Sequence, residues 1–495
     1  MSGMTAPAGR AGSRRRHLRA ALVFVAAALC AHSACATLPR AIGRAFLDAG
    51  IPLNAVAIVV QETGTPRPLF AYDERRPMNA ASVMKLVTTF AALELLGPDY
   101  RWKTEAYLDG TLADGTLDGN LIVKGYGDPK FTIEQWQRFM AALRAQGLAA
   151  VGGDLVLDRS HFGLPPHDPA AFDGEPIMPY NVGPDALLVN FKSVRLAFAP
   201  SAGGDAVDLR AEPPLPGIAL GAPPPLGNGA CNDWRAAVGA AFANGAATAR
   251  VTFSGRYPAS CAQRDWYVAL LDAPNYAHAM FTTYFRTAGG QFTGAVREGR
   301  APAGATPFVT LESPPLYDIV RDINKLSNNV MARQLFLTLA TTAFAPPLTT
   351  AQAGETVRRW LERRKLRMPE LVLENGSGLS RQERISAGGL ARLLAAADAS
   401  KVRDEFASSL AVAAVDGTVQ RRFQNGNVAG QALLKTGSLE GVRGLAGYVI
   451  DAEGRRWIVV ALINHANAAR GSPALDFLVQ WVYRNGAAWR NVVER

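Results

Sequence analysis

The pattern of apolar and polar positions gives both ends of the chain a regular texture. Near the start, the apolar runs 55–60 and 69–72 are separated by a turn-rich stretch at 63–66, a pattern typical of two strands. From Ser82 onward the apolar residues recur at helical spacing, and Gly97-Pro98 ends that periodicity. Two strands and a helix that begins at Ser82 are therefore predicted.

Helical spacing returns late in the chain and is followed by a hairpin. We predict helices at 316–326, 330–340, 355–366 and 387–397, strands at 445–450 and 457–463, and a closing helix that carries the apolar residues 475, 477, 478, 481 and 482. The first and last strands are expected to join in one antiparallel sheet whose faces are covered by helices, an α/β architecture. In this prediction residues 37–97 and 304–495 form one domain.

The middle of the chain, residues 98–303, differs from both ends. Short strand-like runs at 121–123, 154–157 and 187–190 alternate with clusters of proline and glycine. The densest of these clusters, 212–225, predicts a solvated loop. We expect this stretch to be a large, mainly β insertion into the domain formed by the two ends.

The first 36 residues have the layout of an export signal. Five arginines and no acidic residue precede the apolar stretch 20–30, and Ala34-Cys35-Ala36 offers small residues for cleavage. We predict a signal peptide at 1–36, cleaved near Ala36, and a periplasmic protein. The stretch 13–18 leaves the twin-arginine export route open beside the ordinary secretory one. No later segment has the roughly 18 uninterrupted apolar residues of a membrane span, so membrane association would be peripheral at most.

Composition narrows the class of protein further. Of the 495 residues 48% are hydrophobic and 19% are charged, which supports a sizeable core and excludes a disordered or fibrous chain. The formal net charge of +10 favours a nucleic-acid partner at first sight. However, five of the 52 basic residues precede the cleavage position and no basic run follows it, so no nucleic-acid partner is expected.

Export also changes the meaning of the cysteines. Cys231 and Cys261 remain after cleavage, and an even pair in an oxidising compartment predicts one disulfide; two buried free thiols are the alternative. The sequence holds no His-Glu-x-x-His motif, no Cys-x-x-Cys motif and no glycine-rich phosphate loop. Neither a metal nor a cofactor is therefore expected.

Candidate chemistry begins with Ser82 and Lys85. Residues three apart on a helix share a face, so the lysine amine can reach the serine hydroxyl. A serine becomes nucleophilic when a neighbouring base takes its proton, and a lysine can be that base when burial or a second cation lowers its pKa. Taken singly, the pair is better explained as a helix-capping serine and a solvent-exposed lysine.

Two further clusters change this interpretation. Ser327-Asn328-Asn329 falls between two predicted helices, and Lys435-Thr436-Gly437-Ser438 directly precedes the terminal hairpin, where it can form an edge strand. With the Ser-x-x-Lys pair they make, in order, the three elements of the serine β-lactamase/DD-peptidase signature. Two lysines beside one serine would lower each other's pKa, which permits covalent catalysis without histidine.

With these motifs the sequence resembles the class C low-molecular-mass penicillin-binding proteins, the D-alanyl-D-alanine carboxypeptidase/endopeptidases of the penicillin-binding protein 4 type, over nearly the whole exported chain. Gly127-Asp128-Pro129, Tyr180-Asn181 and the stretch 375–381 are similar to this family, as is the interval of 242 positions between Lys85 and Ser327. The resemblance implies a serine β-lactamase/DD-peptidase (transpeptidase-like) fold in which 98–303 forms two extra lobes. The cysteine pair is similar to a disulfide common in such insertions.

The resemblance also implies roles for the first two motifs. Ser82 would attack the carbonyl between two D-alanines and form an acyl-enzyme, and Lys85 would accept its proton. Ser327 and Lys435 would relay a proton to the leaving amine, and Asn329 would hold the amide side of the substrate.

The third motif would bind the end of the substrate. Lys435 and Thr436 would hold the terminal carboxylate, or the corresponding carboxylate of a penicillin, and Gly437 bares the backbone of the same strand. The backbone N–H groups of Ser82 and Ser438 would form the oxyanion hole.

The function implied is that of a periplasmic serine-type D-Ala-D-Ala carboxypeptidase and DD-endopeptidase, which acts on peptidoglycan stem peptides and is acylated by β-lactam antibiotics. A β-lactamase or esterase of the same superfamily and a wall-binding protein without catalysis are the alternatives. The intact serine and both lysines argue against the last of these, because a pure binding site needs no nucleophile.

Overall fold

The computed structural model describes residues 1–5 and 38–493. Apart from residues 1–5, the predicted signal peptide and its cleavage position lie outside the described residues. Within the two described ranges, no helix is long and apolar enough to cross a membrane.

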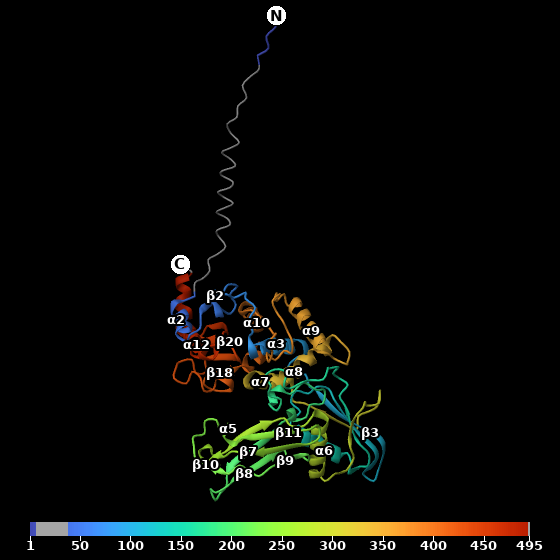
Figure 1. Cartoon of the computed structure of the whole chain (residues 1–495). Helices are drawn as coiled ribbons and strands as arrows, with labels where there is room; N and C mark the ends of the chain where they lie inside the picture. The colour runs from blue at the N-terminus through green and yellow to red at the C-terminus, as the bar shows by residue number, and fades with distance from the viewer. Residues whose placement is uncertain (6–37, 494–495) are drawn as a thin grey trace.

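One antiparallel sheet of six strands joins the two ends of the chain (Figure 1). Its N-terminal strand pairs with the last strand over seven residues, from Val56 opposite Ile463 to Glu62 opposite Trp457. The predicted union of first and last strands is therefore confirmed. In order across the sheet the strands are β18 (Ala411–Val412), β19 (Ala432–Leu439), β20 (Val442–Ile450), β21 (Arg456–Asn464), β1 (Val56–Glu62) and β2 (Phe70–Tyr72).

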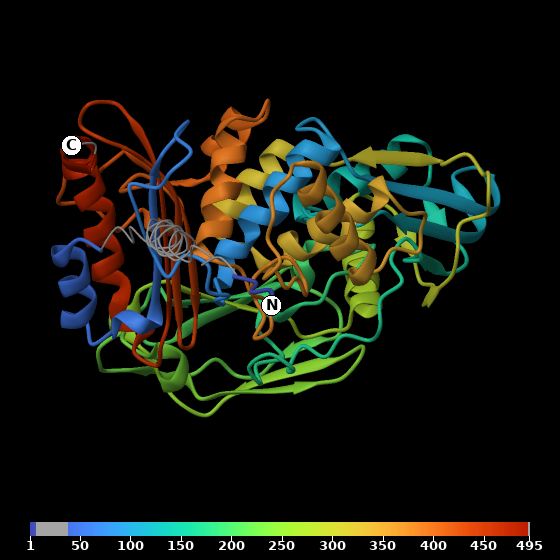
Figure 2. The same ribbon diagram turned by 90° about the horizontal axis from the view of Figure 1, so that it is seen from above.

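The apolar run at 56–60 explains why this sheet is covered on both faces. Successive side chains of a strand point to opposite faces, and here Ala57 and Val59 belong to one core whereas Val56, Ile58 and Val60 belong to another. Figure 2 shows the sheet between helices on its two sides. The first core contains α3 (Lys85–Leu96), α7 (Leu316–Leu326), α8 (Asn329–Thr338), α9 (Thr350–Arg363), α10 (Ala387–Asp398) and α11 (Arg403–Ser409); the second contains α2 (Arg40–Asp48) and α12 (Ser472–Val493).

The middle of the chain folds into several further sheets around a core of its own, below the six-stranded sheet in Figure 1. This is the mainly β insertion that the sequence predicts. The larger sheet has seven strands and lies beside two helices: β3 (Lys103–Ala113), β4 (Thr116–Gly125), β5 (Ala150–Val151), β6 (Leu155–Asp158), β15 (Gln291–Phe292), β16 (Val296–Glu298), β17 (Val309–Glu312), α4 (Ile133–Ala145) and α6 (Ala273–Thr287).

The remaining strands of the insertion form smaller sheets that surround a short helix. Aromatic side chains such as Phe198, Trp234 and Tyr257 pack on one another in this part of the core. Its elements are β7 (Val194–Pro200), β8 (Val207–Glu212), β14 (Arg264–Val268), β9 (Ile218–Leu220), β11 (Ala240–Asn244), β12 (Ala249–Phe253), β10 (Leu226–Gly227), β13 (Tyr257–Pro258) and α5 (Trp234–Val238).

Two predictions for the insertion were wrong. The run 187–190 is not a strand: Leu187 and Val189 are buried in the core of the insertion, Leu188 packs against Val330 of α8, and a 3-10 turn with positive φ follows at 190–192. These apolar residues are buried because they link two cores. The cluster 212–225 is also not wholly loop, since its three central residues form β9 and pair in parallel with β12.

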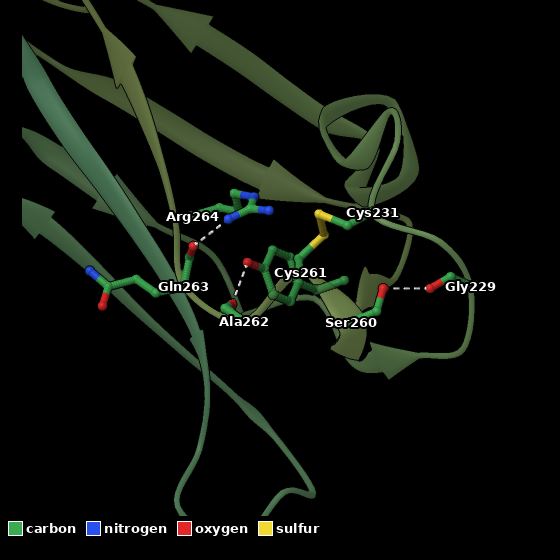
Figure 3. The surroundings of a disulfide bond; sticks show 8 residues. Gly229, Cys231, Ser260, Cys261, Ala262, Gln263 and Arg264 are labelled. Atoms are coloured by element: carbon green, nitrogen blue, oxygen red, sulfur yellow. Dashed lines mark hydrogen bonds between the residues drawn. A yellow bond between two sulfur atoms is a disulfide. The ribbon is translucent and has the colours of Figure 1, made fainter. Parts of the chain in front are cut away.

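The predicted disulfide between Cys231 and Cys261 is present (Figure 3). Cys261 ends the 3-10 turn η5 (Ala259–Cys261) and is buried, and Cys231 precedes helix α5. Beside the bridge, the Ser260 hydroxyl donates to Gly229 O at 2.7 Å. The bond thus joins two irregular segments that lie next to the short strand pair β10–β13.

We expect that replacing both cysteines by serine destabilises the insertion. A closed loop of about 30 residues contributes roughly 3.5 kcal/mol in the chain-entropy account of disulfides. Calorimetric unfolding of the wild type should therefore show a lower Tm after reduction, and the double variant should show that lower Tm with or without reductant. Equal Tm values for wild type and variant under oxidising conditions would contradict this expectation.

Candidate active site

Ser82 lies on a tight turn in front of helix α3. The predicted helix begins as a 3-10 turn, η2 (Ala81–Met84), and becomes α-helical at Lys85. Ala81 has a φ of +47°, and its N–H donates to Asn79 Oδ1 at 2.8 Å. The Asn464 side chain both accepts from and donates to the backbone of Asn79. These bonds fix the backbone that presents the partly exposed hydroxyl of Ser82.

Two glycines allow other segments to approach this turn. A Cβ on Gly437 of β19 would overlap Ala80 O and lie 3.1 Å from Ser82 N. A Cβ on Gly378, whose φ is +80°, would overlap Ala81 O and lie 2.8 Å from Ser82 N. Gly437 belongs to the third predicted motif, whereas Gly378 lies in the family-like stretch 375–381 and had no predicted role.

Lys85 makes three contacts through a single fully buried amine. Its Nζ lies 2.8 Å from Ser82 Oγ, 2.6 Å from Asn329 Oδ1 and 2.5 Å from the carbonyl oxygen of Ser377. The last two oxygens are acceptors, so they take the two N–H groups of a neutral amine. The lone pair of that amine then faces the hydroxyl of Ser82, which is the arrangement of a base beside a nucleophile.

The surroundings of Lys85 favour this neutral amine. Burial holds the pKa of Lys85 well below its ordinary value, and the positive charges of Lys435 and Arg333 lower it further. The carboxylate of Glu383 acts in the opposite direction and raises the pKa of Lys85. A lysine whose pKa is lowered in this way can act as a general base near neutral pH.

The second lysine contacts a different serine. Ser327 ends α7 in the left-handed conformation with a φ of +59°, and Asn328 caps α8 by accepting from Met331 N–H. Lys435 Nζ donates to Ser327 Oγ at 2.9 Å and to Thr436 O at 2.8 Å. The sequence pattern predicts both lysines beside one serine. In the structure Lys85 contacts Ser82, and Lys435 contacts Ser327. Burial lowers the pKa of Lys435 to about 7.

Strand β19 presents the third motif at an open edge. Strand β18 pairs with Leu433 and Leu434, and among the described residues no strand continues beside 435–438 on that side. The Thr436 hydroxyl shares a hydrogen bond of 2.8 Å with the Thr418 hydroxyl, and Ser438 is exposed. Thr418 was not predicted, and it adds a second hydroxyl to this edge.

A cavity of about 720 Å³ lies beside the loop whose Ser377 carbonyl holds Lys85. Both parts of the chain contribute to it, so the insertion forms one of its walls. Its lining includes Arg333, Phe336, Asn375, Leu379 and Arg381 from the domain with the sheet, and Pro165, His167, Phe172 and Asn181 from the insertion.

Sequence reasoning missed the buried charges around Lys85. Glu383 is 1% exposed and Arg333 is 7% exposed. Glu383 stands in the strongly polar stretch 380–384, and neither residue belongs to one of the three motifs. Nothing in the sequence pattern marks these two side chains as buried.

The fold is the serine β-lactamase/DD-peptidase fold, and the chain belongs to a class of carboxypeptidases with that fold. The chain belongs to the D-Ala-D-Ala carboxypeptidase 3 (S13) family, whose sequence profile matches residues 38–484. It is 26% identical over 406 residues to the D-alanyl-D-alanine carboxypeptidase DacB of Haemophilus influenzae, which covers 79% of this chain and 82% of that relative. The resemblance inferred from the motifs is thereby confirmed.

Solved structures show the same fold. Penicillin binding protein 4 (dacB) from Haemophilus influenzae superposes with a TM-score of 0.74 at 24% identity, over 90% of this chain and 99% of that one. The same protein complexed with a β-lactam gives a TM-score of 0.70 at 23% identity, with the same coverage. Bd3459, a predatory peptidoglycan endopeptidase from Bdellovibrio bacteriovorus, gives a TM-score of 0.51 at 16% identity over 86% and 92% of the two chains.

We expect that Gly378→Ala strongly impairs catalysis. The added methyl group would displace the Ala81–Ser82 backbone, and a misplacement of about 1 Å can cost roughly a hundredfold in rate. Steady-state hydrolysis of a peptide ending in D-Ala-D-Ala measures this loss. Gly426→Ala is the matched control, since a Cβ there meets nothing within 4 Å. Equal activity of the two variants would show that Gly378 does not shape the Ser82 turn.

Proposed function

We propose that this protein is a periplasmic serine-type D-Ala-D-Ala carboxypeptidase and DD-endopeptidase that cleaves peptidoglycan stem peptides through an acyl-serine intermediate and is acylated by penicillins. The observation that carries the proposal is the contact between Ser82 Oγ and the buried Lys85 amine, whose other two neighbours are carbonyl oxygens. The family and the printed activities of its relatives support the choice of substrate.

Acylation begins at Ser82. Its Oγ attacks the carbonyl carbon of the penultimate D-alanine, and its proton passes to Lys85 Nζ. The tetrahedral intermediate collapses when the C–N bond breaks, and the leaving amine takes a proton from Ser327 Oγ. Lys435, which contacts Ser327 at 2.9 Å, returns a proton to that oxygen. Water then hydrolyses the acyl-enzyme and the shortened stem peptide leaves. Ser82 Oγ recovers the proton held by Lys85, and the proton lost by the attacking water replaces the one that Lys435 gave up.

Recognition of the substrate involves the open edge of β19. Lys435 and Thr436 bind the terminal carboxylate; the Lys435 amine lies at the backbone oxygen of Thr436, and the Thr436 hydroxyl adds a second donor. Ser82 and Ser438 supply backbone N–H groups to the oxyanion, a geometry supported by the close approach of Gly437 to Ser82 N. The side chain of Asn329 binds the amide side of the substrate and, in the same position, accepts from Lys85.

We propose that the chain has two functional parts. Residues 37–97 and 304–495 form the penicillin-binding domain, and 98–303 form a two-lobed accessory region that supplies one wall of the cavity beside the loop that holds Lys85. A wall built from a separate region is suited to select among stem peptides. Export into the periplasm is supported by the N-terminal pattern, and membrane association, if present, is peripheral.

Penicillin is expected to leave a persistent covalent adduct on Ser82. Mass spectrometry of the intact protein and of its peptides gives the modified residue and the lifetime of the adduct together. Ser82→Ala should form no adduct and should release no D-alanine from a muropeptide, while its Tm stays near that of the wild type. Residual D-alanine release near the wild-type rate would refute Ser82 as the nucleophile, and rapid loss of the adduct would favour a β-lactamase.

Binding of a peptide with a free terminal carboxylate is expected to weaken above neutral pH. The pKa of Lys435 in the free enzyme is about 7, so its ammonium group is present below that pH and is lost as the pH rises through it. The Kd should then increase by up to about tenfold per pH unit. Calorimetric titration of the Ser82→Ala variant isolates binding from chemistry. The same peptide with an amidated C-terminus should show no such increase, and parallel pH profiles for the two peptides would contradict the role of Lys435.

A further inference from the structure

We propose that Glu383 is a positioning residue of this reaction: its buried carboxylate fixes the loop that holds Lys85 and supplies the negative charge that balances the cation formed at Lys85 during acylation. This inference rests on the proposed function, in which Lys85 takes the proton of Ser82. Glu383 does not act on the substrate itself, because its side chain lies in the interior with 1% of its surface exposed.

The carboxylate organises the loop in front of Lys85 through one oxygen. Glu383 Oε1 accepts from the backbone N–H groups of Glu374, Asn375 and Gly376 at 3.0, 2.9 and 2.9 Å. Three successive N–H groups aimed at one oxygen curl the backbone into a cradle for an anion. The loop conformation is therefore set by a side chain that lies seven positions beyond Gly376.

The same loop carries the carbonyl groups that hold helix α3. Gly376 O accepts from Thr88 Oγ1 at 2.6 Å, and Ser377 O accepts from Lys85 Nζ at 2.5 Å. Glu383 and the Lys85 amine are thus hydrogen-bonded to neighbouring peptide groups of the same short loop. Loss of the carboxylate would release the Ser377 carbonyl, and with it one of the two acceptors that direct the lone pair of Lys85 to the hydroxyl.

The charge of Glu383 has a second consequence at Lys85. Three basic side chains lie in this part of the interior: Lys85 on α3, Lys435 on β19 and Arg333 on α8. Glu383 is the carboxylate that acts on Lys85 from among the described residues, and it acts on Arg333 together with the exposed Glu374. Burial raises the pKa of Glu383, while the three N–H donors oppose this by stabilising the ionised form.

Acylation makes this charge necessary. When Lys85 accepts the proton of Ser82, a full positive charge appears at a buried nitrogen where water cannot solvate it. In such a medium a neighbouring carboxylate interacts much more strongly than it would in water. Without that carboxylate the pKa of Lys85 falls further, so the amine stays neutral to lower pH and becomes a weaker base.

The test compares two glutamates of this segment. Glu383→Gln keeps an oxygen for the three N–H groups and removes the charge, and Glu374→Gln removes a charge from the same loop at an exposed position. The pH profile of kcat/KM for a D-Ala-D-Ala peptide and the rate of penicillin acylation are measured for wild type and both variants, with Tm as the measure of folding.

For Glu383→Gln we expect the acid limb of the profile to move to lower pH, because more acid is needed to protonate Lys85 once its pKa has fallen. The plateau rate should fall by about tenfold or more, because the base is weaker. Glu374→Gln should keep the acid limb of the wild type. A purely structural role would lower Tm and the plateau without moving the limb.

A wild-type pH profile in folded Glu383→Gln would overturn the proposal. If this variant does not fold, Glu383→Asp decides the question, because it keeps the charge while shortening the reach to the loop. Its acid limb should stay at the wild-type position, and a limb that moves to lower pH would also overturn the proposal. In either case the wild type still hydrolyses the peptide and forms its Ser82 adduct, so this failure is distinct from a failure of the proposed function.

Discussion

The structure depends on one constraint: a lysine amine must be buried next to a serine hydroxyl and must be able to remain unprotonated there. The three neighbours of Lys85 Nζ meet this requirement. Two carbonyl oxygens accept from its N–H groups, and the hydroxyl of Ser82 faces its lone pair. These neighbours come from an adjacent turn, from the start of α8 and from a loop nearly three hundred residues away. The six-stranded sheet and its two layers of helices are the frame that brings these segments to one point.

Burial of charge is the main energetic cost of this arrangement. Lys85 and Lys435 are fully buried and Arg333 is nearly so. Burial removes the hydration that would stabilise a charge on any of them. Three features offset this cost. The pKa values of both lysines are lowered, Lys435 is hydrogen-bonded to Ser327, and the carboxylate of Glu383 lies among these basic side chains. The two apolar cores on the faces of the six-stranded sheet provide the stability that offsets the burial of these groups.

The insertion is built on different principles and lines a cavity beside the loop that holds Lys85. Its core is separate, its sheets are small, and a disulfide joins two of its irregular segments. It is tied to the domain with the sheet by buried contacts such as Leu188 with Val330 and by Arg333, which donates to Val182 O.

The sequence by itself determined the long helices and strands of the sheet domain, because their apolar periodicities are regular, but not the short elements α2, α11 and β18. It also determined the cysteine pair and the three motifs in their order. It did not reveal that each lysine has its own serine, that Gly378 permits the turn at Ser82, or that Glu383 is buried beneath the loop. It also misjudged 187–190, whose apolar side chains link two cores. These features were decided by tertiary structure alone, because a residue's burial and the charges around it depend on segments that are distant in sequence and meet only in the folded chain.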